Sequence, residues 1–533
     1  MRAFKWIFLC FPLVCFAITD KQFNEICQKQ RRVSTNLVKS AVTGFDNEKS
    51  LKLSKNNGDQ SRYADLRGNF NKALKHQTNG FPTNAAYSSL IKALTSGSPQ
   101  SFLNIILGIG AVKLVNPQGS FAYSLAANDS WLNAIPPAPK FASNEAAAEM
   151  VEVYWTAVCR DVPFNMFATN AKVLEAIDDL NTLVDFYGPK IDGLVTPGTY
   201  LRGNTPGDLI GPYISQFFYQ TVPYGSTTIP PEQTVPKGTT VNDFNTTFAD
   251  WFTVINGGLT GATTDYDPVT HFIRTPRDLA AYVHFDAPGQ VYYNALRILD
   301  SYGSSALDSN NPYRSNSTQF GFVSYGISQI FQLLTDAIAE ALKAAWFHKW
   351  QVNRRLRPEE YGFYVQKQKA DGMDLGIPSQ LINSTSLDSV YESNSTYFLP
   401  QAYPEGCPTH PSYPAGHATL SGAAATILKA FFNENYAIPS PLMPSSDNTT
   451  LEAYPGTLLV GNELNKLAAN VSLGRDHAGV HYRSDGFQGM LLGEKVAIDI
   501  LNNSAYLFNE DFKGFHLTKF DGTKIIVGKR KKP

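Results

Sequence analysis

Three cations and three histidines recur in three short segments in the second half of this 533-residue chain. The cations are Lys349, Arg357 and Arg475, and the histidines are His410, His417 and His481. Guanidinium groups bind oxyanions in bidentate fashion, and histidines can serve as ligands, nucleophiles or general acids and bases. Because the net charge is −1, no overall basic field attracts anions or nucleic acid. We therefore predict a local pocket for a tetrahedral oxyanion.

The segment PTHPSYPAGHATLSG (Pro408–Gly422) predicts the start of a helix over residues 417–433. The free N–H groups and the positive dipole end of a helix N-terminus favour a bound anion. Gly416 would let the anion approach the backbone closely. His417, at the start of the helix, is positioned to act as a general acid or base.

Lys349 and Arg357 can reach the same pocket only if the chain changes direction between them. The apolar periodicity predicts a long helix over Phe322–Leu356, which must end there because Arg357 precedes a proline. On a continuous helix Lys349 and Arg357 would lie about 80° apart. We expect them to converge only if Arg357 reaches back from the helix end.

The segment GRDHAGVHYRSDG (Gly474–Gly486) predicts a break between two helices, because it contains Gly474 and Gly479. We expect one helix over residues 461–473, with Arg475 at its end, and a second from His481 to about Leu501. Asp485 lies four residues after His481, where it could orient the imidazole ring.

Other elements are expected to support this pocket. Helices are predicted over Ser143–Arg160 and, with a break at Pro288-Gly289, over Thr275–Leu299. Alternating residues in Phe508–Val527 around a Phe-Asp-Gly-Thr turn predict a β-hairpin. We assign no chemistry to His348, His477 and Asn353.

The N-terminus has the pattern of a secretory signal, since Arg2 and Lys5 precede the apolar run Trp6–Ile18 and a small-x-small site. We predict that residues 1–19 are removed and that the protein is secreted. No segment supplies the run of about 20 apolar residues that spans a membrane. The remaining cysteines permit one disulfide at most: Cys27, Cys159 and Cys407. Glycosylation sequons begin at Asn245, Asn316, Asn383, Asn394 and Asn448.

The segments KWQVNRRLRPE, THPSYPAGHAT and GRDHAGVHYRSDG resemble the three signature blocks of the vanadium-dependent haloperoxidases, most closely the bromoperoxidases of marine algae. Further similarity lies in Glu152–Phe164, Gly321–Phe331 and Phe487–Glu494. The resemblance extends from about Glu145 to the C-terminal hairpin, whereas the first hundred residues match poorly. It implies a mainly α fold in which two four-helix bundles surround vanadate, with long loops and a small C-terminal β-hairpin.

This resemblance divides the chain into four parts. They are a signal peptide at 1–19, a loop-rich and helical region at 20–140, a helical catalytic domain at 141–507, and a hairpin with a basic tail at 508–533. The implied reaction is the oxidation of bromide or iodide by hydrogen peroxide to hypohalous acid, which halogenates small organic acceptors. The implied cofactor is vanadate, without haem, and vanadium(V) would act as a Lewis acid. Because such relatives are commonly dimers or larger, we expect a homo-oligomer.

The family roles map onto single positions of this chain. The resemblance implies His481 as the vanadium ligand, with Lys349, Arg357, Arg475 and the Gly416 amide on the vanadate oxygens and His417 as the acid or base beside the apical oxygen. Lys349 would also polarise the bound peroxide. His410 stands where chloroperoxidases have an aromatic residue, which favours bromide over chloride. Trp346 corresponds to a position in the pocket wall.

Two positions depart from the family pattern. The family usually has Pro-Ser-Gly-His where this chain has Pro414-Ala415-Gly416-His417. A serine hydroxyl would donate a hydrogen bond to a vanadate oxygen, and its loss would weaken anion binding by about 1.5–3 kcal/mol. Asn353 likewise replaces a histidine that is common in the algal enzymes.

Two other functions use the same kind of pocket. In acid phosphatases of the type-2 phosphatidic acid phosphatase superfamily, the equivalent of His481 is a nucleophile and Asp485 matches the last residue of the motif. Seven residues separate Lys349 from Arg357, however, where the phosphatases have six, which favours the peroxidase. A secreted, non-catalytic oxyanion-binding protein is the third hypothesis. The presence of His417, Lys349 and His410 argues against it, since binding alone does not need an acid or base.

Overall fold

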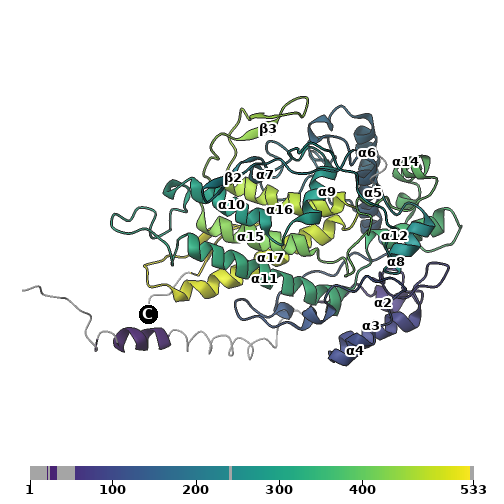
Figure 1. The fold of residues 1–533 in the computed structure, drawn as a ribbon, viewed down its shortest axis with the longest axis horizontal. Coiled ribbons are helices and arrows are strands. Elements are labelled where there is room, and N and C mark those ends of the chain that lie inside the picture. Colours follow the sequence, from purple (N-terminus) through teal and green to yellow (C-terminus); the bar gives the residue numbers. More distant parts are fainter. Residues whose placement is uncertain (1–20, 22–23, 33–53, 239–242, 529–533) are drawn as a thin grey trace, which may run out of the picture. The chain divides into compact units, whose positions relative to one another are not determined.

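The computed structural model describes residues 21, 24–32, 54–238 and 243–528 (Figure 1). The contacts within the chain separate residues 1–51 from residues 52–533. In the first unit residues 24–32 are helical. The predicted signal peptide and the basic tail lie outside the described residues. The predicted domain boundary near residue 141 stays a prediction.

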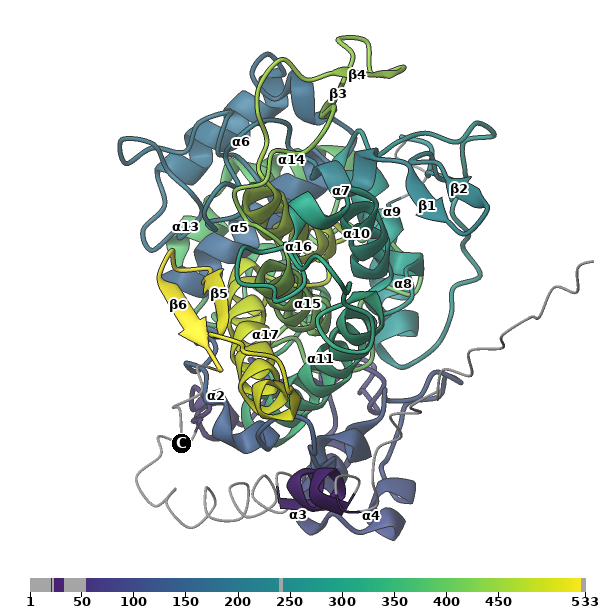
Figure 2. The same ribbon diagram turned by 90° about the vertical axis from the view of Figure 1, so that its left-hand side faces the viewer.

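Four long helices form the bundle at the centre of the second unit. They are α11 (Ile327–Phe347), α15 (Gly416–Phe431), α16 (Val460–His477) and α17 (Arg483–Ser504). Helix α15 is buried along its whole length and packs against the other three, as Figure 2 shows from a direction that views α11 and α17 nearly end-on. Its small residues permit this packing. A Cβ atom on Gly422 would lie 2.1 Å from the Met490 carbonyl oxygen, and one on Gly493 would lie 1.9 Å from that of Thr419.

A second group of helices surrounds α5. It consists of α5 (Asn144–Val158), α6 (Ala171–Asn181), α12 (Pro358–Lys369), α13 (Ser379–Ile382) and α14 (Thr385–Asn394), and α5 also packs against α16. The Ser143 hydroxyl caps α5 by accepting from the Ala146 N–H. The helix predicted over Ser143–Arg160 is thereby confirmed.

Shorter elements complete the second unit. The further α-helices are α2 (Asp59–Arg62), α3 (Asn84–Ser96), α4 (Pro99–Leu103), α7 (Gln216–Tyr219), α8 (Phe248–Ile255), α9 (Pro276–Phe285) and α10 (Gln290–Ser301). The 3₁₀ turns are η2 (Pro117–Phe121), η3 (Ser130–Leu132), η4 (Phe164–Met166), η6 (Ser304–Ala306) and η8 (Ala505–Leu507). The strands are β1 (Val222–Tyr224), β2 (Thr227–Ile229), β3 (Leu442–Pro444), β4 (Leu451–Ala453), β5 (Phe515–Thr518) and β6 (Lys524–Val527). The strands pair as three antiparallel hairpins, β1–β2, β3–β4 and β5–β6.

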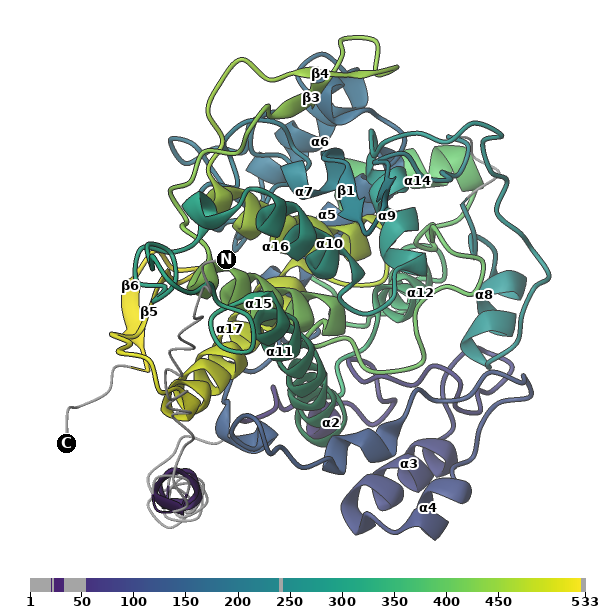
Figure 3. The same cartoon turned by 60° about the vertical axis from the view of Figure 1, so that its left-hand side comes forward.

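The expected fold class, mainly α with a C-terminal hairpin, is confirmed. Strands β5 and β6 pair from Phe515 with Val527 to Thr518 with Lys524, and they lie against α15 and α17 (Figure 3). The break predicted at Pro288-Gly289 separates α9 from α10. Among the described residues, none of the helices has both the length and the hydrophobicity that a membrane crossing requires.

Two predicted boundaries are wrong. Helix α11 begins at Ile327 rather than Phe322, and its α-helical part ends at Phe347. The next six residues, His348–Asn353, form the π-helical turn η7, and Arg354 then adopts a left-handed conformation with φ of 45°. Periodicity did not reveal this wider turn, because a single turn at the end of a long helix contributes too few residues to a pattern summed over many turns. Gly474 does not interrupt α16, and the break falls at Gly479, whose φ is 77°.

The three cysteines after the predicted signal peptide are free thiols in the structure. Cys159 and Cys407 are buried, whereas Cys27 is exposed. Stability therefore comes from the core formed by the two helical groups.

Candidate active site

The ends of the four bundle helices converge on one group of polar side chains. Lys349 lies in the π turn after α11, Arg357 caps α12, Gly416 begins α15, Arg475 lies in the last turn of α16, and His481 lies two residues before the start of α17. We refer to these five residues as the oxyanion pocket. The π turn and the left-handed Arg354 redirect the chain, so Arg357 approaches from α12 rather than from the end of α11.

Lys349 is fully buried, and its ammonium donates to two neutral oxygens. The Nζ atom lies 2.7 Å from the Pro411 carbonyl oxygen and 2.8 Å from that of Ser412. Burial lowers the pKa of Lys349 well below 10.5, and the charges of Arg357 and Arg475 lower it further. Lys349 forms no ion pair with a carboxylate in the described part of the chain.

Arg357 is also fully buried and donates to neutral groups. Its Nε lies 2.8 Å from the His410 carbonyl oxygen, and its Nη1 lies 2.7 Å from that of Val480 and 2.9 Å from His481 Nε2. The Glu360 carboxylate accepts from the Arg357 backbone N–H at 2.5 Å and from the Asn71 N–H at 2.6 Å. Glu360 therefore positions the backbone of Arg357 and does not neutralise the guanidinium.

Arg475 completes the group of cations and is 5% exposed. Its Nη1 donates to the Val283 carbonyl oxygen at 2.6 Å and lies 3.4 Å from the Tyr403 hydroxyl. Its buried Nε has no hydrogen-bond partner among the described residues. An unsatisfied buried donor on a cation indicates space for an acceptor that the protein itself does not provide.

His481 is held by a chain of buried ion pairs. Its Nδ1 lies 2.8 Å from Asp485 Oδ2, which also accepts from the Ser412 hydroxyl, and Asp485 Oδ1 lies 2.7 Å from Arg355 Nη1. The Nη2 of the same arginine lies 2.7 Å from Glu149 Oε2. Because Nδ1 faces a carboxylate, it carries the proton, and the lone pair of Nε2 points towards Arg357. Burial lowers the pKa of His481 well below 6.5, with further contributions from Arg357 and Lys349.

His417 lies at the mouth of the oxyanion pocket, with 28% of its side chain exposed. Its Nε2 is 3.1 Å from the buried carboxylate of Asp286, which follows the last residue of α9. Burial and the charge of Arg475 lower the pKa of His417, whereas Asp286 raises it. This histidine–carboxylate pair can exchange a proton with solvent and carry it into the pocket.

His410 and Trp346 form one wall of the oxyanion pocket. Their ring centroids are 4.9 Å apart, and His410 Nδ1 lies 2.9 Å from Arg357 Nη2. Burial lowers the pKa of His410 well below 6.5, as do Arg357 and Lys349. A Cβ atom on Gly416 would lie 3.2 Å from the Trp346 ring, so the indole packs closely on the backbone at the start of α15.

Ala415 occupies the N-cap position of α15 and is buried, with no side-chain cap. Its own N–H donates to the Asp485 carbonyl oxygen at 2.9 Å. The first N–H groups of α15 therefore have no serine or threonine oxygen to satisfy them from this position.

The structure brings all the predicted site residues together, but sequence reasoning missed several of their partners. Arg355 and Ser412 lie within the sequence motifs of the site, but only the structure shows which residues they contact. Asp286 and Glu149 come from distant segments, and no sequence spacing links them to the pocket. His348 and His477, by contrast, are core residues, bonded to the Asn133 carbonyl oxygen at 2.9 Å and the Tyr213 hydroxyl at 3.1 Å.

Comparisons with known proteins were made for the whole chain. The family model for the VCPO second helical-bundle domain matches residues 329–510, which contain α15, α16, α17 and most of α11. A vanadium-dependent bromoperoxidase from Corallina officinalis is 33% identical over 544 aligned residues, covering 86% of this chain and 90% of that protein. One from Ascophyllum nodosum is 34% identical over 514 residues, covering 89% of each chain.

A solved structure gives the same result for the fold. The homohexameric vanadate-dependent bromoperoxidase AnII from Ascophyllum nodosum superimposes with a TM-score of 0.88 and is 27% identical, covering 99% of this chain and 94% of that one. The expected family resemblance is confirmed, and it extends further towards the N-terminus than the sequence motifs indicated.

Proposed function

The chain belongs to the family of vanadium-dependent bromoperoxidases and is an enzyme of that type, and we propose that it oxidises bromide with hydrogen peroxide at vanadate held in the oxyanion pocket. The observation that carries this proposal is the group of three buried cations, Lys349, Arg357 and Arg475, none of which pairs with a carboxylate in the part of the chain that the structure describes. Burying like charges together is costly unless an anion compensates them.

The residues present fit vanadate. Arg475 Nε is a buried donor without a partner, and Lys349 and Arg357 present further donors from neighbouring helix ends. Gly416 is the first residue of α15, and the N–H groups at a helix N-terminus favour a bound anion. His481 Nε2 faces the same space and carries a lone pair. Three cations, a helix N-terminus and one imidazole form a donor set for an oxyanion that also accepts a nitrogen ligand.

When bound, vanadate would supply a Lewis-acidic vanadium(V) centre that activates hydrogen peroxide without a change in oxidation state. His481 would hold the metal through Nε2, because Asp485 fixes the proton on Nδ1. The three cations would hold the vanadate oxygens. Their positive charge would also attract the halide, since the pocket is buried and its charges are poorly screened.

His417 is the acid and base in this proposal. Asp286 orients the ring through Nε2, which leaves Nδ1 available to donate or accept a proton. The partial exposure of His417 allows it to exchange that proton with solvent. Trp346 and His410 would shape the halide site, and we propose that it takes bromide and iodide.

Two further properties are proposed from the comparisons and from the sequence. Because the AnII relative is homohexameric, we propose that this chain also forms a homo-oligomer, which light scattering coupled to size exclusion tests directly. The pattern of residues 1–19 supports secretion. The proposal predicts that the protein expressed in a secretory host begins near residue 20, which N-terminal sequencing would determine.

The decisive experiment is halogenation of a phenol-type dye by the purified chain with hydrogen peroxide, before and after vanadate is added to apo protein. Bromide, iodide and chloride are supplied separately. We expect activity with bromide and iodide that requires vanadate and that phosphate suppresses by competition. Hydrolysis of a phosphate ester by the apo protein, without halogenation by the vanadate-loaded protein, would contradict the proposal and favour a phosphatase.

A further inference from the structure

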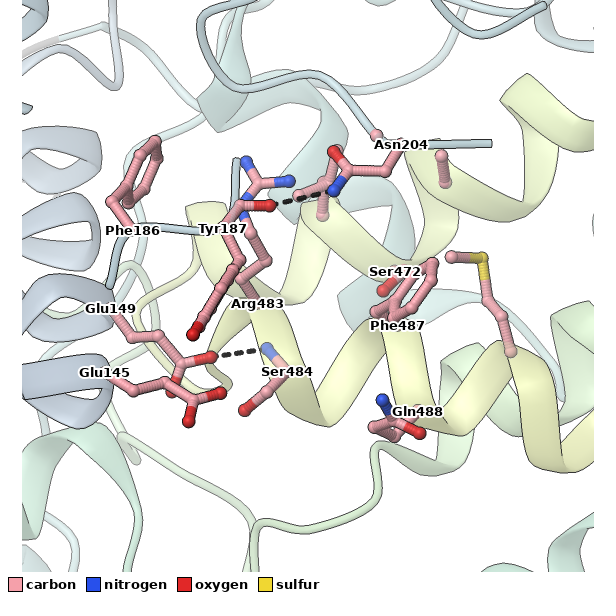
Figure 4. Close-up of a pocket in the computed structure, with 14 residues that line it drawn as sticks. Glu145, Glu149, Phe186, Tyr187, Asn204, Ser472, Arg483, Ser484, Phe487 and Gln488 are labelled. Atoms are coloured by element: carbon pink, nitrogen blue, oxygen red, sulfur yellow. Dashed lines mark hydrogen bonds between the residues drawn. The ribbon is translucent and has the colours of Figure 1, made fainter. Parts of the chain in front are cut away.

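A second cavity, of about 360 Å³, lies beside the start of α17 (Figure 4). Its polar lining includes Glu145 and Glu149 from α5 and Ser484 from α17. Its apolar lining comprises Phe186, Leu473, Phe487 and Met490, with Phe186 and Phe487 on opposite sides. We refer to it as the acid-rich cavity. Its volume falls within the range of about 300–1,000 Å³ that is usual for small-molecule sites.

The two glutamates differ in how the protein satisfies them. Glu149 pairs with Arg355 at 2.7 Å and accepts from the Ser484 N–H at 2.6 Å, the bond drawn in Figure 4. Glu145 is half-buried and forms neither a hydrogen bond nor an ion pair through its carboxylate within the described ranges. Burial raises the pKa of Glu145, and the neighbouring charge of Glu149 raises it further.

The one cation in the wall of the acid-rich cavity is already neutralised. Arg483 binds Glu152 in a bidentate manner, with Nε 2.9 Å from Oε2 and Nη2 2.5 Å from Oε1. Asp185 adds a further negative charge near Glu145. Lys190 lies 5.8 Å from the centre of the Phe186 ring, and Arg355 pairs with Glu149, so among the described residues the negative charge without a direct partner in this cavity is that of Glu145.

The remainder of the wall suits an organic body rather than a bare metal ion. Phe186 and Phe487 present aromatic rings, Ser472 presents a hydroxyl, and Gln488 presents an amide (Figure 4). Within the described chain no group of three or more histidine, cysteine or acidic side chains could hold a metal. Aromatic faces near carboxylates are the usual surroundings of an ammonium group on an organic molecule.

We propose that the acid-rich cavity is a binding site for a small organic ammonium ion, whose cationic end pairs with Glu145 and Glu149 and whose apolar body packs against Phe186 and Phe487. This site is separate from the oxyanion pocket and selects the opposite charge. It does not depend on the bromoperoxidase activity, because its residues neither hold vanadate nor move the proton.

Calorimetry with benzylammonium as the probe tests the proposal on the full chain, with benzyl alcohol and benzoate as neutral and anionic isosteres. We expect one benzylammonium site per chain and no binding of the other two at the same concentrations. Equal binding of benzyl alcohol would overturn the proposal, because the carboxylates would then contribute nothing to recognition.

Variants locate the binding site within the molecule. Glu145→Gln removes the unpaired charge without disturbing Arg355, and it should weaken benzylammonium binding about tenfold, as expected for one partly exposed charge pair. Gln488→Lys introduces a cation of similar size into the wall and should abolish binding. Glu392→Gln, at an exposed glutamate of α14, is the matched control and should bind like the wild type.

Phosphate affinity of each apo variant provides the readout for an intact fold. The affinity should stay at the wild-type value, since none of the three positions belongs to the oxyanion pocket. Wild-type benzylammonium affinity in both Glu145→Gln and Gln488→Lys, with phosphate affinity preserved, would refute the assignment of this cavity.

Discussion

The oxyanion pocket and the acid-rich cavity are joined by one chain of contacts and have opposite charge. His481, Asp485, Arg355 and Glu149 connect them, each bonded to the next. In the oxyanion pocket the cations donate to backbone carbonyl oxygens, which carry no net charge. In the acid-rich cavity Glu145 has no cation of its own. In each region the charge that the protein leaves uncompensated indicates the charge of the ligand.

The Arg355 guanidinium lies between the two regions and pairs with one carboxylate of each. It lies 3.8 Å from the centre of the Tyr482 ring and pairs with a carboxylate on each side. Arg355 therefore pairs with the Asp485 carboxylate, which would otherwise neutralise the cations of the oxyanion pocket. The second oxygen of Asp485 remains available to His481. The following substitutions test this account, starting with the largest expected effect.

Removing one pocket cation should have the largest effect on activity. Lys349→Met keeps the volume but deletes a buried charge, so the second-order rate constant for bromide should fall about 10²–10³-fold, as when one preorganised electrostatic group is lost. Steady-state bromination and phosphate affinity of the apo protein would measure it. Lys343→Met, on α11 just before the π turn and with a side chain that is 34% exposed, is the control and should retain wild-type values. A variant as active as the wild type would show that Lys349 is a structural residue.

Breaking the chain between the two regions should affect both binding and stability. Arg355→Met leaves Glu149 and Asp485 buried without their partner, and the unfolding free energy should fall by about 3–5 kcal/mol. Because Asp485 would then be free to neutralise the pocket, phosphate or vanadate affinity should weaken about 10–100-fold. Urea unfolding and calorimetry measure the two effects. Arg314→Met, outside both regions, should change neither, and unchanged oxyanion affinity in Arg355→Met would disprove the positioning role.

The next substitution removes the charge of Asp476, a further acidic residue in the region around Arg355. This aspartate is buried, its Oδ1 has no hydrogen-bond partner among the described residues, and burial raises its pKa well above 3.8, as do Glu152 and Asp485. The pKa of this carboxyl is higher in the folded state than in the unfolded state. Its contribution to the unfolding free energy is therefore fully present below pH 3.8 and is lost as the pH rises through the folded-state pKa. Asp476→Asn should therefore be more stable than the wild type at pH 7.5, by about 1–3 kcal/mol.

The advantage of Asp476→Asn should shrink as the pH falls towards 4, where the wild-type carboxyl is protonated. Denaturation by urea at several pH values measures it. Asp388→Asn, at an exposed position, should stay within about 0.5 kcal/mol of the wild type at every pH. A destabilised Asp476→Asn at pH 7.5 would mean that the carboxylate is compensated by a partner.

The smallest expected effect concerns the helix cap of the oxyanion pocket. Ala415→Ser adds a hydroxyl at the N-cap of α15, where it can accept from the first helical N–H groups and donate to a bound oxygen. A serine cap contributes about 0.5–2 kcal/mol, so phosphate should bind several-fold more tightly and the melting temperature should rise. Ala418→Ser, at a buried position three residues further along, controls for the added hydroxyl. Equal effects of both substitutions would rule out a specific role for position 415.

The sequence by itself determined the elements and the chemistry of the oxyanion pocket. Helical periodicity, the residue before Pro358 and the turn at Asp521-Gly522 are local features, so the helices and the C-terminal hairpin could be predicted from them. The types and spacing of Lys349, Arg357, Arg475 and the histidines indicated an oxyanion and the family.

The tertiary structure alone decided which charges are compensated. Asp286, Glu149 and Arg355 acquire their roles from contacts between segments far apart in sequence, 131 residues for Asp286 with His417 and 206 for Glu149 with Arg355. The π turn after α11 and the acid-rich cavity also depend on packing. The reason is that burial and pairing are properties of neighbours in space, whereas a sequence pattern specifies only the types of residue and their spacing along the chain.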